Sequence, residues 1–148
     1  MNISLNMTGK SFSSQLDIIQ KKMLATSQKA VVKVGIELLD LAIQECPIDT
    51  GALRKSGLVK LNGQIIAKGS KKNVIASYNV NLQDGKFEVE VSFNTPYALR
   101  QHEVLSYVHK VGKAKYLEDP LKNNITRFMD IIINETQKEL KKWVVLQK

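Results

Sequence analysis

The sequence has little of what builds disulfide-linked, metal-bound or membrane-spanning structures. Its 148 residues include one cysteine and two histidines. A single cysteine excludes an internal disulfide and is typical of a reducing compartment. No uninterrupted apolar run reaches the ~20 residues that a membrane helix needs, and the N-terminus lacks the apolar core of a signal peptide. We therefore expect a soluble intracellular protein.

Proline and glycine are also sparse, with three and eight residues, which argues against a low-complexity chain. Hydrophobic residues make up 43% and charged residues 24% of the sequence, as in ordinary globular proteins. The length suits one domain with a real core. We expect a single domain over residues 1–148, in which residues 1–13 form a flexible N-terminal arm.

Positive charge is in excess, because the net charge is +8 and the isoelectric point is about 9.6. Residues 47–85 hold six Lys or Arg against two acids. The densest group is Lys68, Lys71 and Lys72. Such a group is either a solvated loop or a surface that meets a polyanion such as nucleic acid.

Residues 14–45 carry apolar side chains at helical spacing, and Ser14 with Asp17 resembles a capping box. The predicted helix is about 48 Å long at ~1.5 Å per residue. Gly35 inside it indicates a bend or a close contact. A helix of this length exceeds what a small sheet can cover. Part of its apolar stripe therefore faces another subunit, or the helix curves or breaks within one domain.

The segment after this helix changes the architecture of the chain. Pro47 cannot continue a helix, and Gly51 tolerates a left-handed turn. Asp49 and Thr50 can accept hydrogen bonds from backbone N–H groups. Residues 52–56 then fit one short helical turn.

Strand patterns fill residues 58–93. Asn62-Gly63 interrupts an apolar run and is a strong hairpin signal. Alternating apolar residues predict strands over 74–82 and 87–93, with a tight turn at Asp84-Gly85. This period of two favours antiparallel hairpins with one wet face.

The rest of the chain returns to helix. Residues 97–103 predict a short helical turn, and residues 104–115 an irregular loop that could order only when a partner binds. Asp119-Pro120 begins a second amphipathic helix over residues 120–144. The fold class is therefore α+β: an antiparallel β-sheet of hairpins packed against a long N-terminal helix and a C-terminal helix.

Two patterns resemble catalytic or metal motifs. Residues 48–52 spell the active-site word of retroviral-type aspartic proteases, and a homodimer would supply the second aspartate beside Asp49. That word should end a β-strand, whereas here it follows a proline after a helix. His102, Glu103 and His109 could bind a metal, but the zinc-protease motif needs its second histidine at position 106. We expect no enzyme activity and no cofactor.

Three stretches, in order, resemble the neck or head–tail joining proteins of tailed phages, which are also labelled tail-completion or minor capsid proteins. They are PIDTGALRKS at 47–56, VEVSFNTPYA at 89–98 followed by QHE at 101–103, and GKAKYLEDPL at 112–121. The resemblance implies a structural virion protein, made in the bacterial host cytoplasm. It implies a homo-oligomeric ring between the head connector or adaptor and the tail terminator or tail tube. Genomic double-stranded DNA would pass through the lumen, without a membrane or a cofactor.

Within this hypothesis, charge density suggests which residues face the lumen or an acidic neighbour: Arg54, Lys55, Lys68, Lys71 and Lys72. A docking loop would use Tyr107, His109, Lys110 and Lys113. Two alternatives stay open on the sequence alone. One is a non-specific nucleic-acid-binding module. The other, more remote, is a homodimeric aspartic protease that uses Asp49.

Overall fold

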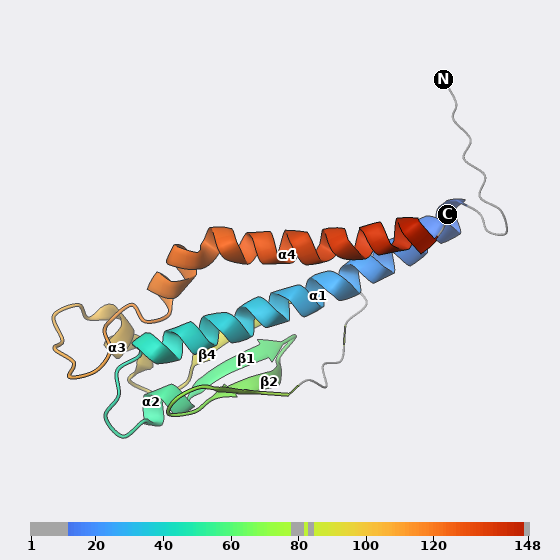
Figure 1. Cartoon of the computed structure of the whole chain (residues 1–148). Coiled ribbons are helices and arrows are strands. Elements are labelled where there is room, and N and C mark those ends of the chain that lie inside the picture. The colour runs from blue at the N-terminus through green and yellow to red at the C-terminus, as the bar shows by residue number, and fades with distance from the viewer. Residues whose placement is uncertain (1–11, 78–81, 83–84, 147–148) are drawn as a thin grey trace.

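Two long helices and one small antiparallel sheet are stacked in three layers (Figure 1). The computed structural model describes residues 12–77, 82 and 85–146. Helix α1 lies between the sheet and helix α4, so both helices are on the same side of the sheet. This confirms the α+β prediction. The elements are α1 (Phe12–Glu45), α2 (Ala52–Lys55), β1 (Gly57–Leu61), β2 (Gln64–Gly69), β3 (Val74–Ala76), β4 (Val89–Phe93), α3 (Ala98–Glu103) and α4 (Glu118–Leu146).

The four strands lie in the order β3-β2-β1-β4, and every neighbouring pair is antiparallel. The β1–β2 turn is Asn62-Gly63, with φ of 46° and 82°, as the hairpin signal predicts. The β1–β2 register shifts between Val59 and Lys60, whose partners are Ala67 and Ile65. Ile66 is the extra residue of this bulge, and it is buried.

The main core lies between α1 and the sheet. It includes Leu39 and Ile43 of α1 and Val59 of β1, which have no exposed surface. A Cβ atom on Gly35 would come within 2.8 Å of the Val89 side chain. The glycine therefore marks a close approach of the helix to the sheet, one of the two roles that the sequence left open.

Helix α4 packs along the side of α1 that faces away from the sheet. Phe128 is buried there, and the Arg127 guanidinium is 2.5 Å from the Glu37 carboxylate. Nearer the N-terminal end of α1, Ser27 Oγ is 3.3 Å from Thr136 Oγ1 of α4. The residues of α1 in the sheet core begin at Val32. Residues 12–31 of α1 and 132–146 of α4 therefore form a two-helix extension beyond the sheet (Figure 1).

The helix bounds differ from the prediction by two residues at most, since α1 was expected over 14–45 and α4 over 120–144. The strand predicted over 74–82 ends at Ala76. Residues 78–81 and 83–84 lie outside the described residues, as do residues 1–11 of the predicted arm. Within the described ranges, no helix is long and apolar enough to cross a bilayer.

Candidate functional site

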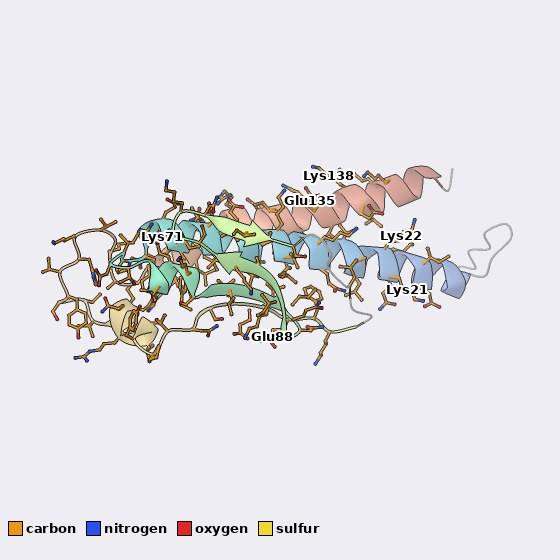
Figure 2. The ribbon with its side chains drawn as sticks, turned by 90° about the horizontal axis from the view of Figure 1, so that it is seen from below. Lys21, Lys22, Lys71, Glu88, Glu135 and Lys138 are labelled. Carbon is orange, nitrogen blue, oxygen red and sulfur yellow. The ribbon has the colours of Figure 1, made fainter. Side chains whose placement is uncertain are left out.

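Most of the residues singled out in the sequence come together at the end of the molecule opposite the two-helix extension. Helices α2 and α3 lie at this end, with the segment after α1 and the loop before α4 (Figure 1). Lys71 also lies here, whereas Lys21 and Lys22 lie on the extension (Figure 2). This end therefore contains the candidate surfaces for binding a partner.

Arg54 fastens the segment after α1 to the end of that helix. Its Nε and Nη2 atoms donate to the Cys46 carbonyl oxygen at 3.1 and 2.8 Å, and Nη1 donates to the Lys71 carbonyl oxygen at 3.2 Å. The last carbonyls of a helix lack intrahelical donors, and the guanidinium satisfies one of them. Arg54 is only 8% exposed. Its guanidinium group binds carbonyl oxygens of the chain itself. In this it differs from the other four basic residues that were predicted to face a lumen.

The basic loop between β2 and β3 is a tightly bonded turn. Ser70 Oγ accepts hydrogen bonds from the N–H groups of Lys72 and Asn73 and donates to Asn73 Oδ1. Gln44 Nε2 of α1 donates to the Lys72 carbonyl oxygen at 3.0 Å. The Lys71 side chain lies against Gly51, whose φ is 86°. The loop thus holds two lysines at a fixed place on the surface.

Four lysines remain free to meet an anion. Lys55, Lys68, Lys71 and Lys72 are exposed. Among the described residues, none of them forms an ion pair with a carboxylate. Because their charge is not neutralised within the chain, they give this end a local positive potential.

The loop before α4 is wrapped around the end of α1. Gly112, with φ of 83°, lies so close that a Cβ atom would be 2.5 Å from the Pro47 nitrogen. The Lys113 N–H donates to the Glu45 carbonyl oxygen at 2.9 Å, and Lys113 Nζ is 2.7 Å from Asp119 Oδ2. This part of the loop is therefore bonded to the end of α1 and to the start of α4. Lys113, predicted for docking, is bonded within the chain.

The other predicted docking residues differ in exposure. The Tyr107 ring is half-buried beneath the Arg100 guanidinium, 5.7 Å from the ring centroid. His109 is half-buried with its ring edge-on to Tyr107, and Lys110 is exposed. Lys110 is therefore the predicted docking residue whose charged group is available at the surface.

A cleft of about 350 Å³ separates this loop from the segment after α1. Its walls are residues 47–53 and 108–111, with Tyr97 and Gln101 beside them. His109 Nε2 is enclosed and has no hydrogen-bond partner in the described part of the chain. The lining of the cleft combines apolar and polar groups.

Residues 48–52, which resemble the active-site sequence of aspartic proteases, line this cleft. Their backbone does not have the geometry of that active site. Asp49 is exposed in an irregular segment between α1 and α2, not at the end of a strand. Thr50 Oγ1 accepts a hydrogen bond from the Ala52 N–H at 3.3 Å. The word therefore forms a turn that leads into α2.

The predicted metal trio is not assembled, because His109 lies in the cleft while His102 and Glu103 cluster with Glu118. His102 Nδ1 is 2.6 Å from Glu103 Oε1, and His102 Nε2 accepts from the Glu118 N–H at 3.3 Å. Lys115 Nζ lies 2.5 Å from Glu103 and 2.9 Å from Glu118. The Lys115 ammonium group thus lies between the carboxylates of Glu103 and Glu118, in the place where a metal cation would bind.

Electrostatic effects in this cluster lower the pKa of both carboxyl groups. Hydrogen bonds from Lys122 and then Lys115 lower the pKa of Glu118 to about 2. Hydrogen bonds from Lys115 and His102 lower the pKa of Glu103. In contrast, burial raises the pKa of the Cys46 thiol to about 12, which leaves it protonated and unreactive.

One feature of this end was missed by the sequence reasoning. Leu99, Leu105 and Val108 are 73%, 74% and 98% exposed, and we call them the apolar tip. The three residues lie within ten positions of one another in the chain, and exposed apolar side chains that cluster mark interaction sites. The sequence signal for this feature was the presence of aliphatic residues in the segment 104–115, which has neither helical nor strand periodicity.

A family profile described as "Bacteriophage HK97-gp10, putative tail-component" matches residues 10–119. The matched stretch runs from before α1 to the start of α4, and it includes the basic loop, the cleft and the apolar tip. No curated protein and no solved structure matches the chain. The match covers well over half of the sequence and agrees with the resemblance of the three stretches between residues 47 and 121. The chain therefore belongs to the HK97 gp10-like family of bacteriophage tail components.

Proposed function

We propose that this chain is a structural virion protein that forms a ring of identical subunits in the neck of a tailed phage. The ring joins the head connector or adaptor to the tail terminator or tail tube, and genomic DNA passes through its lumen. Membership of a phage tail-component family carries this proposal. It is supported by an exposed apolar tip, which a monomer would leave uncovered.

The lysines at the end opposite the extension are the candidates for the lumen or for an acidic neighbour: Lys55, Lys68, Lys71 and Lys72. They are exposed and lack ion pairs within the described chain. Contact with DNA in such a channel has to be weak, because the genome slides past. A few exposed ammonium groups meet phosphates without reading sequence, which fits this requirement.

Charge reversal tests this proposal. Phage that lack the gene are complemented with a variant in which all four lysines are replaced by glutamate. We expect a loss of particle assembly or of DNA ejection. The control reverses four exposed lysines of α1, which changes the net charge equally: Lys21, Lys22, Lys29 and Lys33. Normal assembly and ejection with the first variant would contradict the assignment of these lysines.

The net charge of +8 favours one second candidate, a non-specific nucleic-acid-binding module. Such a module binds duplex DNA as a free protein, with an affinity that falls steeply as salt rises. The neck proposal predicts only weak binding by the free subunit at physiological salt. Tight, salt-sensitive binding to duplex DNA, together with no assembly on phage particles, would favour the module.

A further inference from the structure

A second group of exposed apolar side chains runs along α4. Four large residues at a spacing of four are 40–51% exposed: Leu121, Ile125, Met129 and Ile133. We call them the α4 stripe. Side chains at this spacing form one ridge of a helix and pack against a neighbouring protein surface in many helical interfaces. The exposed stripe is therefore a candidate contact.

The stripe lies on one flank of the α1–α4 pair. At about 100° per residue, Ile125 and Met129 lie roughly 60° and 100° to one side of the buried Phe128. Arg127 lies about 100° to the other side, where it pairs with Glu37. The flank of Arg127 is thus occupied by an ion pair with α1, whereas the four apolar side chains of the other flank are each half-covered by the fold. The ion pair between Lys122 and Glu118 lies on that second flank, at the Leu121 end of the stripe.

We propose that the apolar tip of one copy packs on the α4 stripe of the next copy. This inference rests on the proposed ring. A ring of more than two identical subunits needs a heterologous contact, in which two different surfaces of the chain meet. The tip lies at one end of the molecule, and its Val108 is almost fully exposed, whereas the stripe follows the side of α4. The two surfaces therefore differ in place and in shape.

Charges beside the two surfaces are complementary. Arg100 and Lys110 lie in the segment that carries the tip, and Asp130 follows Met129 of the stripe. Neither Lys110 nor Asp130 forms an ion pair with another described residue. Their opposite charges would set the register of the contact and speed association.

The free face of the sheet is a less suitable partner for the tip. Ile65 and Ile75 are exposed there beside a shallow hollow of about 260 Å³. Lys68 pairs in register with Ile75, and Lys60 with Ile65. Lys60 is paired with Glu90, but Lys68 has no acidic partner among the described residues, so covering this face would remove an unpaired ammonium group from water. The charged groups beside the Leu121 end of the α4 stripe, Lys122 and Glu118, are already paired with each other.

Cysteine cross-linking tests the contact directly. Cys46 is fully buried and protonated, so the wild-type protein is the control and should give no cross-link. Val108→Cys and Met129→Cys are made separately, and both sites are exposed enough to leave the core intact. Under mild oxidation, we expect disulfide-linked dimers only when the two variants are mixed. The chain with both substitutions should give a ladder that ends at the ring size.

Four other results would overturn the contact. Dimers of Met129→Cys alone would indicate α4 pairing about a two-fold axis. Linkage of Val108→Cys to Ile75→Cys would indicate the sheet face. A ring seen by light scattering without the Val108–Met129 cross-link would reject this contact but leave the proposed ring intact. Monomers even beside purified connector would reject both.

Charge exchange gives an independent readout of the same contact. Lys110→Glu alone and Asp130→Lys alone should each weaken assembly, measured as the protein concentration at half-assembly. The variant with both changes should recover most of the wild-type behaviour. Equal weakening in the double variant, with no recovery, would contradict the pairing of these two sides.

Discussion

At the scale of single residues, Arg54 uses its guanidinium group to hold two segments of the chain together. Its guanidinium joins the end of α1 to the basic loop through the carbonyl oxygens of Cys46 and Lys71. It therefore fixes the position of Lys71 and Lys72 relative to the cleft. The sequence alone could not distinguish the role of Arg54 from that of Lys55, because the two differ in burial, which only the structure shows.

Replacement of Arg54 by methionine keeps an unbranched apolar stem and removes the hydrogen-bond donors. The buried Cys46 carbonyl then loses its partner, and we expect the free energy of unfolding to fall by about 1–3 kcal/mol. Lys55→Met is the matched control, because Lys55 is exposed, and it should change stability by less than about 0.5 kcal/mol. Urea denaturation measures both. Equal midpoints for the two variants would contradict the role of Arg54.

Gly112 is required for a different reason, the close approach of the loop to α1. Gly112→Ala places a Cβ atom 2.5 Å from the Pro47 nitrogen, in a residue with φ of 83°. Gly63 has nearly the same φ, 82°, but no atom within 4 Å of its Cβ position. Gly63→Ala should therefore lose only about 1–2 kcal/mol from the left-handed backbone. Gly112→Ala should lose about 1–3 kcal/mol more from the clash. Thermal unfolding of both variants compares them, and a smaller loss at Gly112 would refute the packing.

The carboxyl groups around Lys115 predict a pH dependence. The pKa of Glu118 is about 2 in the folded chain against an ordinary 4.5, so the folded state favours the carboxylate. This contribution to stability is complete above pH ~4.5 and is lost as the pH falls toward 2. Lys115→Met removes one cause of the low pKa. We expect its urea midpoint to fall less between pH 5 and pH 2.5 than that of the wild type.

Lys29→Met is the control for this titration, because Lys29 is exposed and its positive charge contacts no carboxylate among the described residues. It should keep the pH profile of the wild type. If the Lys115 variant also kept that profile, the cluster would not contribute to stability in acid. The effect should shrink at high salt, since the groups are exposed to solvent.

At the scale of elements, α4 has two faces with different roles. Phe128 is 2% exposed against α1, whereas its neighbour Met129 is 51% exposed on the α4 stripe. We expect Phe128→Ala to lower the free energy of unfolding by about 3–5 kcal/mol. Met129→Ala should change the stability of the monomer by less than about 1 kcal/mol but weaken assembly. Denaturation and light scattering on both variants separate the roles, and similar losses of stability would contradict them.

The elements themselves were largely predictable because their patterns are local. The helical spacing of apolar residues predicted both long helices, and Asn62-Gly63 predicted the first hairpin. The strand expected over 87–93 begins at Val89, since the Glu88 N–H bonds the Asn62 side chain instead of a strand. The order of the loop before α4 was not predictable. It depends on Gly112 meeting the end of α1, a contact between segments distant in sequence.

At the scale of the whole molecule, stacking in three layers leaves surfaces uncovered at both ends. The extension carries α1 and α4 past the sheet, and the opposite end carries the basic loop, the cleft and the apolar tip (Figure 1). The sequence predicted that α1 is too long for its sheet, and the structure shows that α4 covers part of the excess. Under the proposed function, the remaining exposed apolar groups contact other copies or other virion proteins.

The most direct test of the ring is the mass and shape of the purified protein, with and without its head connector. Light scattering gives the mass, and negative-stain microscopy of the same samples gives the shape. We expect closed rings with a central opening, formed either by the protein alone or on the connector. A protein that stays monomeric beside the connector and every tail component would contradict the central claim.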